Sequence, residues 1–387
     1  MTARILFYTN TNSLPEHWDK VSNGNFFLTK KYLSLLENHS PKELSHCFFG
    51  YFLNNQLSGI GLCQFLDLKQ VNHITSKKGK VKTLFSRLFT HYLSRKVCFF
   101  GNNMLTGQHA FTLNKNLPEA NVLNFIKLLE IETKKNTLFK KTQLFIFKDF
   151  YPNQTKLLSK VLKSYMRFYI QPNMVLSVKN NWNYWQDYID QLKKKYRQQL
   201  NRASNKLTGF NFRTLEIDEI IHYQQDIENL YLNVCLSSSF NTFILDKTHF
   251  INLKKQLKQT FTLTGLFDNH NHLVGFYTLI IDNGQASTYF LGYESKLQKP
   301  HMIYLNMLYH MIKSIITFNS KKNSNQKINQ INFSRTAMEI KSSVGAVPYQ
   351  MAGFIKHRNP ILNQLIHLIF PFFEPQIKWK QRHPFKN

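Results

Sequence analysis

The segment from Asn332 to Ala346, with the sequence NFSRTAMEIKSSVGA, places charged and hydroxyl side chains directly after a short apolar run. A cation beside such hydroxyl groups can stabilise negative charge that develops during a reaction. Lys341 supplies such a cation and is the first candidate catalytic residue. Ser334 and Arg335 are candidates for binding a carbonyl or phosphate group, with Glu339 in a supporting position. Alternatively, Arg335 and Glu339 form an ion pair with only a structural role.

Length and composition indicate a globular chain with two domains, because 387 residues exceed one domain of ordinary size. Fifty Lys and Arg against 22 Asp and Glu give a formal charge of +28. This excess indicates an anionic partner, such as nucleic acid, an anionic membrane surface or a phosphate-rich cofactor, unless it reflects biased composition alone. The four cysteines are scattered without metal-ligand spacing, so neither a disulfide framework nor a metal site is expected.

The N-terminus lacks the apolar core of a signal peptide, and no stretch is apolar over the length of a membrane span. A cytoplasmic location is therefore expected, with attachment to the inner face of the membrane as a further option. Oligomeric state cannot be inferred from the sequence.

Hydrophobic periodicity predicts one order of elements that occurs in both halves of the chain. In the first half we expect a hairpin over 46–66, a helix over 120–136 and a strand over 141–150. In the second half we expect a hairpin over 261–282, a strand over 286–295, a helix over 301–319 and a strand over 328–333. The shared order predicts two α/β (α+β) domains with mixed, mainly antiparallel sheets flanked by helices, at residues 1–180 and 181–387.

Two segments combine apolar and basic character. Residues 183–207 predict one helix whose Lys/Arg face is either solvated or in contact with phosphates or lipid headgroups. Residues 361–373, ILNQLIHLIFPFF, predict an apolar helix that ends at Pro371. This helix is expected either to pack in the core of the second domain or to anchor the chain at a membrane.

The order of hairpin, strand, long helix and next strand in the second half resembles the core of the GNAT acyltransferase superfamily. The stronger resemblance is to its double-domain branch, the FemABX-like or peptidoglycan-biosynthesis-like proteins. Three segments carry it: KKKYRQQLNRASNKL (193–207), LGYESKLQKPHMIYLNMLYHMIKS (291–314) and FSRTAMEIKSSVGA (333–346). GNNMLTGQH (101–109) and the basic tail (355–386) are similar to predicted GNAT acyltransferases of comparable length.

The resemblance implies two tandem GNAT-like domains that transfer an acyl group from an activated donor to an amine or hydroxyl by direct attack. It implies that Lys341 contacts the donor carbonyl or a phosphate, and that Tyr293 and Glu294 stand where such sites often hold a base or an acid. Acyl-CoA is one implied donor. Many family members bind its pyrophosphate on a glycine-rich loop, but 294–300 contains no glycine. Lys296 and Lys299 are expected to hold phosphates as point charges instead.

Two other functions compete with this one. The best-known members of the branch use aminoacyl-tRNA, so a tRNA-dependent aminoacyl transferase is an alternative that the charge of +28 suits. The other alternative is a non-enzymatic module that binds RNA or an anionic membrane surface through 183–207 and the tail. His109 is a site candidate only if the first domain contributes to catalysis. The sequence does not identify the donor or the acceptor.

Overall fold

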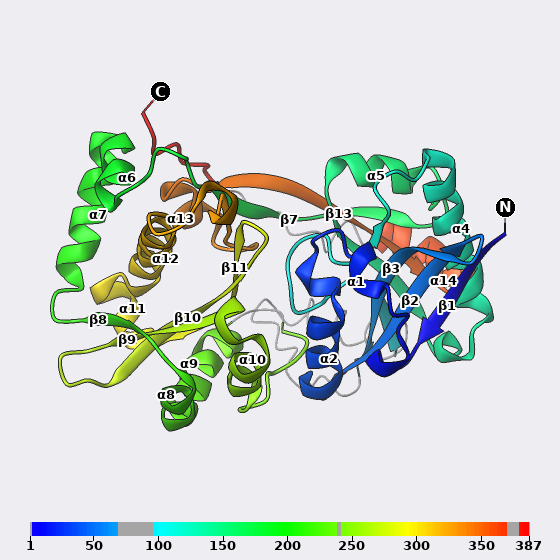
Figure 1. The fold of residues 1–387 in the computed structure, drawn as a ribbon, viewed down its shortest axis with the longest axis horizontal. Coiled ribbons are helices and arrows are strands. Elements are labelled where there is room, and N and C mark those ends of the chain that lie inside the picture. Colours follow the sequence, from blue (N-terminus) through cyan, green and yellow to red (C-terminus); the bar gives the residue numbers. More distant parts are fainter. Residues whose placement is uncertain (1, 69–95, 238–240, 370–378, 387) are drawn as a thin grey trace. The chain divides into compact units, whose positions relative to one another are not determined.

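The computed structural model describes residues 2–68, 96–237, 241–369 and 379–386, which form two compact units (Figure 1). Unit 1 consists of the described residues within Met1–Gln171, Ser239–Asp246 and Gln350–Gln376. Unit 2 consists of those within Pro172–Ser238, Lys247–Tyr349 and Ile377–Asn387. The units differ from the predicted ranges 1–180 and 181–387 because the chain returns to unit 1 twice.

Unit 1 is a sheet with helices packed against it, in the strand order β1-β2-β3-β4-β6-β13, with β5 beside β3. Its own strands are β1 (Ala3–Tyr8), β2 (Leu44–Leu53), β3 (Gln56–Asp67), β4 (Lys96–Phe100), β5 (Phe111–Leu113) and β6 (Leu144–Phe150). Its helices are α1 (Trp18–Val21), α2 (Lys30–His39), α4 (Glu119–Lys135), α5 (Pro152–Ser159) and α14 (Pro360–Ile369), with the short 3-10 helices η1 (Thr11–Ser13), η2 (Phe26–Leu28) and η4 (Thr137–Phe139). The predicted hairpin is present: Asn54 and Asn55 have φ of 47° and 66°, the left-handed values that a two-residue turn requires.

Unit 2 repeats this plan in the strand order β7-β12-β11-β10-β9-β8. Its own strands are β8 (Asn211–Thr214), β9 (Phe261–Phe267), β10 (Leu273–Asp282), β11 (Gln285–Tyr293) and β12 (Gln330–Asn332). Its helices are α6 (Trp185–Gln191), α7 (Lys194–Lys206), α8 (Ile217–His222), α9 (Gln224–Ser237), α10 (His249–Leu257), α11 (Ser295–His301), α12 (Ile303–Asn319) and α13 (Met338–Ser343), with η5 (Lys258–Thr260) and η6 (Ser324–Gln326). The core of unit 2 is centred on α12, where eleven residues from Ile303 to Asn319 are buried.

Two long strands, β7 (Met166–Ser177) and β13 (Val347–His357), each belong to both units. β7 begins in unit 1 and pairs antiparallel with β12 of unit 2, whereas β13 begins in unit 2 and pairs antiparallel with β6 of unit 1. Each unit thus completes its sheet with a strand that starts in the other. The sheets of the two units are thus linked through shared strands, a link that periodicity did not predict.

The two units also share a detail of register. β4 runs parallel to β6 up to the pair Phe100↔Phe147, and β11 runs parallel to β12 up to the pair Ser287↔Asn332. Two residues beyond the last pair, the backbone is left-handed in both units, at Asp149 with φ 64° and at Ser334 with φ 59°. The predicted fold class, two copies of one α/β arrangement, is confirmed.

Three predicted elements differ from the structure. The single helix expected over 183–207 is two helices, α6 and α7, because Leu192 between them is fully buried and makes a β-bridge with Phe385. The loop expected over 294–300 is mostly helix α11. The tail helix α14 belongs to unit 1 and not to the second domain, and Pro371 lies outside the described residues.

Candidate functional site

The candidate site of unit 2 lies where β11 and β12 part. Only three residue pairs join these parallel strands, because β12 ends at Asn332 while β11 continues to Tyr293. Side chains close the junction: the Thr288 hydroxyl donates to the carbonyl of Asn332 at 3.0 Å, and the Ser334 hydroxyl donates to the carbonyl of Thr288 at 3.4 Å. Beyond this point the described ladder partners of β11 lie on β10 alone, so one backbone edge of β11 faces the corner formed by 334–337.

This corner is strained and is held by Lys341. Ser334, Thr336 and Ala337 have left-handed backbones, with φ of 59°, 70° and 45°, and each costs about 1 kcal/mol relative to a right-handed residue. The Lys341 ammonium donates to the carbonyl of Arg335 at 2.7 Å and to that of Ser334 at 3.2 Å. The structure therefore brings together three of the predicted residues, Ser334, Arg335 and Lys341.

Lys341 differs from the other two buried lysines of the described residues, because Lys148 and Lys254 each face a carboxylate. Its side chain lies on α13 and is 3% exposed, and no carboxylate lies within 4.0 Å of it among the described residues. Burial without a counter-charge lowers the pKa of Lys341 to about 7. An amine with this pKa can exchange a proton near neutral pH, as acid–base catalysts do.

Glu339 does not join Lys341. Both residues lie on α13, where side chains two positions apart face different directions. The Glu339 carboxylate accepts hydrogen bonds from Arg382, at 3.0 Å from its Nε. These bonds lower the pKa of Glu339. The alternative ion pair between Glu339 and Arg335 is likewise absent from the described contacts, since Arg382 is the partner.

Tyr293 and Glu294 lie further along β11 than the corner. The Ser334 hydroxyl reaches the carbonyl of Thr288, and Tyr293 is five residues beyond Thr288, about 16 Å at the rise of a strand. Tyr293 is half-buried, which raises its pKa, and its ring centroid is 6.4 Å from that of Tyr304. Glu294 is the residue before α11. The structure therefore does not bring these two candidates beside Lys341.

The residue at the level of the corner is Tyr289, which sequence reasoning missed. Its hydroxyl lies 3.1 Å from Nε2 of His249, a residue of α10 that is 1% exposed. The two residues are 40 positions apart in the sequence, so no local pattern around His249 could predict this contact. A tyrosine hydroxyl in contact with an imidazole is an arrangement that can take up or release a proton.

The start of α12, where a pyrophosphate would bind in a glycine-lined cradle, is occupied by the chain itself. Met302 adopts a left-handed backbone with φ 49°, and the Gln298 side chain accepts the hydrogen bond of the Tyr304 amide at 3.0 Å. Lys296 and Lys299 are exposed on α11. These residues do not fit a backbone cradle for coenzyme A, because an amide it would use is already bonded and no glycine allows close approach.

His109 lies in unit 1, away from the corner of unit 2 along the chain. Its Nδ1 is 3.2 Å from the Asn25 side-chain oxygen, and its ring packs edge-on against Phe27 at 4.6 Å. Burial and then the charge of Lys148 lower the pKa of His109 to about 4. These contacts are those of a neutral structural histidine.

The described residues hold no group of three or more His, Cys, Asp and Glu side chains placed to bind a metal ion. Among them, no helix is both long and apolar enough to cross a membrane.

Comparison with known proteins supports the fold. The sequence matches no protein-family model and no curated protein. The crystal structure of FemX has a TM-score of 0.56 at 11% identity, over 95% of this chain and 100% of that one. Two other similar structures are a tandem GNAT protein from the clavulanic acid biosynthesis pathway, with TM-score 0.49 at 7% identity over 93% and 99% of the two chains, and L-PGS from Bacillus licheniformis, with TM-score 0.46 at 14% identity over 89% and 96%. The duplicated units, the shared strands and the full-length likeness to FemX together show that the chain has a double-domain, FemX-like fold.

Proposed function

We propose that the chain is an acyltransferase that works at the corner of unit 2 by direct attack of an amine or hydroxyl on an activated acyl donor. The observation that carries this proposal is Lys341, a buried amine with a near-neutral pKa at the point where two parallel strands part. A donor carbonyl placed on the open edge of β11 would meet the corner that Lys341 holds. A positive group there stabilises the oxyanion of the tetrahedral intermediate.

The proton of the acceptor also needs a destination. Tyr289 follows Thr288, whose carbonyl the Ser334 hydroxyl contacts, and Nε2 of His249 lies 3.1 Å from the Tyr289 hydroxyl. In the proposed reaction the attacking atom bonds to the carbonyl carbon and its proton passes by way of the Tyr289 hydroxyl to His249. The bond between the carbonyl carbon and the leaving group then breaks, and the same proton is returned to the leaving group. Tyr293 and Glu294, further along β11, remain candidates for orienting the acceptor.

The proposed donor is one that does not need the pyrophosphate cradle of coenzyme A. The amide of Tyr304 is bonded to Gln298, and Met302 takes the place where glycine would be expected. Lys296 and Lys299, exposed on α11, are proposed to attract donor phosphates as point charges. Acyl-CoA is therefore disfavoured as the donor.

One observation favours the second candidate function, transfer of an aminoacyl group from tRNA. α7 and α11 are neighbours, since the His301 ring donates to the carbonyl of Lys206 at 2.8 Å. Among the described residues, none of the following cations on or beside these helices has a carboxylate within 4.0 Å: Lys193, Lys194, Lys195, Arg197, Arg202, Lys206, Lys296 and Lys299. Unpaired cations on one surface are the electrostatic footprint of a polyanion.

The test compares the native chain with Lys341→Met in a cell extract supplied with acetyl-CoA or with total aminoacyl-tRNA. We expect mass spectrometry to find an acylated product with the native chain and about 100- to 1,000-fold less with the variant, the effect of removing one oxyanion contact. Lys322→Met, at an exposed lysine over the Phe318 ring, is the matched control and should leave the product unchanged. Equal product from native chain and Lys341→Met would refute the assignment, and product from acetyl-CoA alone would refute the choice of donor.

A further inference from the structure

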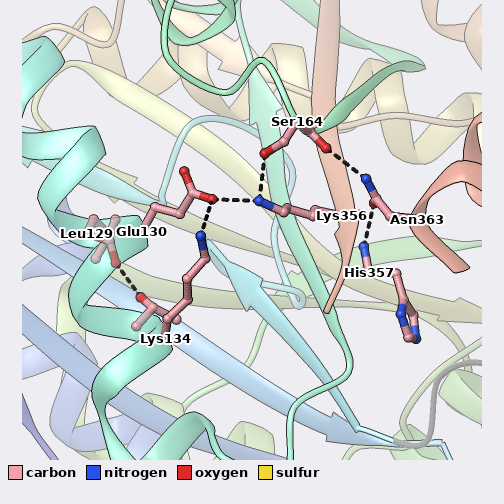
Figure 2. Close-up of polar contacts among 8 residues, drawn as sticks. Leu129, Glu130, Lys134, Ser164, Lys356, His357 and Asn363 are labelled. Carbon is pink, nitrogen blue, oxygen red and sulfur yellow. Dashed lines mark hydrogen bonds and ion pairs between the residues drawn. The ribbon is translucent and has the colours of Figure 1, made fainter. Parts of the chain in front are cut away.

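Helix α14 is fixed to unit 1 by one polar residue and one apolar residue on its inner face. Figure 2 shows Asn363 between two backbone groups: its amide donates to the carbonyl of Ser164 at 3.0 Å and accepts from the amide of His357 at 2.8 Å. Ile366, three positions along the helix, is 2% exposed. Residues three apart lie on the same helix face. The inner face of α14 is therefore the side of Asn363 and Ile366.

The part of unit 1 beneath α14 is itself held by a part-buried network of polar contacts. Lys356 of β13 donates to the carboxylate of Glu130 at 2.7 Å and to the hydroxyl of Ser164 at 2.6 Å, and Lys134 reaches the same carboxylate at 3.1 Å (Figure 2). Although burial raises the pKa of Glu130, the hydrogen bonds of Lys356 and Lys134 outweigh it and lower the pKa overall. Glu130 thus stays ionised and ties β13, α4 and the segment before β7 together, so α14 rests on a fixed support.

The outer face of α14 is apolar. Ile361, Leu365 and Leu368 are 69%, 39% and 69% exposed, and their spacing of four and three residues places them in one stripe opposite Asn363 and Ile366. A surface helix ordinarily turns its apolar stripe inward. The expectation that this segment packs in a core is thus wrong for all but Ile366 among the helix residues whose side chains are described.

Cations lie next to the start of this stripe. Arg358, two residues before α14, donates to the carbonyls of Phe139 at 2.8 Å, Lys140 at 2.7 Å and Thr142 at 3.3 Å. These bonds hold the backbone of 139–142 beside Arg358, and the side chains of Lys140 and Lys141 in this segment are exposed. Neither lysine has a carboxylate within 4.0 Å among the described residues.

We propose that the α14 stripe, Ile361, Leu365 and Leu368, docks unit 1 on an anionic lipid surface, with Lys140 and Lys141 against the headgroups. Aliphatic side chains beside unpaired lysines combine apolar insertion with headgroup attraction. A second copy of this chain fits less well, because a two-fold contact would bring these lysines close to their own copies. The inference does not rest on the proposed acyl transfer, since α14 and the corner lie in different units.

The test is flotation of the full chain with vesicles of phosphatidylcholine alone or mixed with phosphatidylglycerol. We expect binding to the mixed vesicles that weakens as salt is added, because salt screens the lysines. Ile361→Gln with Leu368→Gln should reduce partitioning about tenfold or more, the effect of losing two inserted aliphatic side chains. Lys140→Gln with Lys141→Gln should reduce binding to the mixed vesicles about fivefold per lysine while leaving binding to phosphatidylcholine unchanged.

The matched control is Ile221→Gln with Leu236→Gln, two apolar residues of unit 2 that are 45% and 51% exposed. This control should float like the native chain. If the double change in α14 lowers the melting temperature, Leu368→Gln alone, at a residue 69% exposed, replaces it. Three results would overturn the proposal: a native chain that does not float, an α14 variant that floats as well as the native chain, or a dimer that the α14 variant disperses while vesicles are ignored.

Discussion

The pKa of Lys341 leads to a testable dependence of stability on pH. Burial lowers the pKa from 10.5 to about 7, a difference that corresponds to about 5 kcal/mol because one pKa unit is worth about 1.36 kcal/mol. The unfolded chain, whose lysine is solvated, binds this proton near pH 10.5, and the folded chain does so only near pH 7. Between these values the unfolded state holds more protons, so the free energy of unfolding rises with pH.

Above pH 10.5 the lysine is neutral in both states and has no effect, whereas below about pH 7 its full penalty on the folded state is present. Between pH 9 and pH 7 the native chain should lose about 2 kcal/mol of stability through this group alone. Lys341→Met removes the group. The free energy of unfolding of the native chain minus that of the variant should therefore be about 2 kcal/mol larger at pH 9 than at pH 7.

Urea unfolding at the two pH values measures this difference. Other titrating groups cancel because they are present in both proteins, and Lys322→Met, at an exposed lysine, should run parallel to the native chain. The variant also leaves the carbonyls of Ser334 and Arg335 without their donor, a cost of about 1–3 kcal/mol that does not vary with pH in this range. Parallel stability curves for native chain and Lys341→Met would show that Lys341 keeps an ordinary pKa and would remove the basis for its catalytic assignment.

Three other outcomes are expected. Thr336→Gly, at an exposed residue with φ 70°, should raise the free energy of unfolding by about 1 kcal/mol by relieving left-handed strain. A variant that urea unfolding shows to be less stable than the native chain would contradict this. Burial lowers the pKa of His46, His109 and His310 to about 4. Because the unfolded chain binds these protons more readily, the free energy of unfolding should fall by about 3 kcal/mol per histidine between pH 6.5 and pH 4. His310→Phe should make the measured fall in stability with acid less steep. Lys195→Gln with Arg202→Gln should weaken tRNA binding and lower its salt slope by about 1.4–1.8, unlike Lys322→Gln.

Local features of the chain were predictable because their causes are local. Asn54 and Asn55 form a hairpin turn since asparagine tolerates the left-handed backbone that the turn needs. The cluster around Lys341 could be found because its members are neighbours in sequence, and Lys341 does reach Ser334 and Arg335. The order of elements in the two halves sufficed for the fold class, since most strands of each unit come from neighbouring segments of one half.

What was missed depends on contacts between distant residues. Arg382 is 43 positions from Glu339, and His249 is 40 positions from Tyr289, so neither contact leaves a pattern in the sequence. The strand β13 pairs with β6 about two hundred positions earlier, which moves the tail helix α14 into unit 1. Periodicity predicted that α14 is helical and apolar, but the direction of its apolar stripe is decided by Asn363 and its bonds to Ser164 and His357.

The shared register of the two units gives a reason for proposing the chemistry in unit 2 and not in unit 1. Counting two residues from the last parallel pair makes Asp149 the counterpart of Ser334 and Lys148 the counterpart of Phe333. In unit 1 the buried Lys148 lies 2.5 Å from the Asp149 carboxylate and donates to the carbonyls of Asn102 and Leu105. In unit 2 no carboxylate among the described residues neutralises the buried amine of Lys341, which reaches the corner from α13 and whose pKa burial lowers to about 7. A neutralised and covered lysine stabilises a fold, whereas an uncompensated one can stabilise charge that appears only during a reaction.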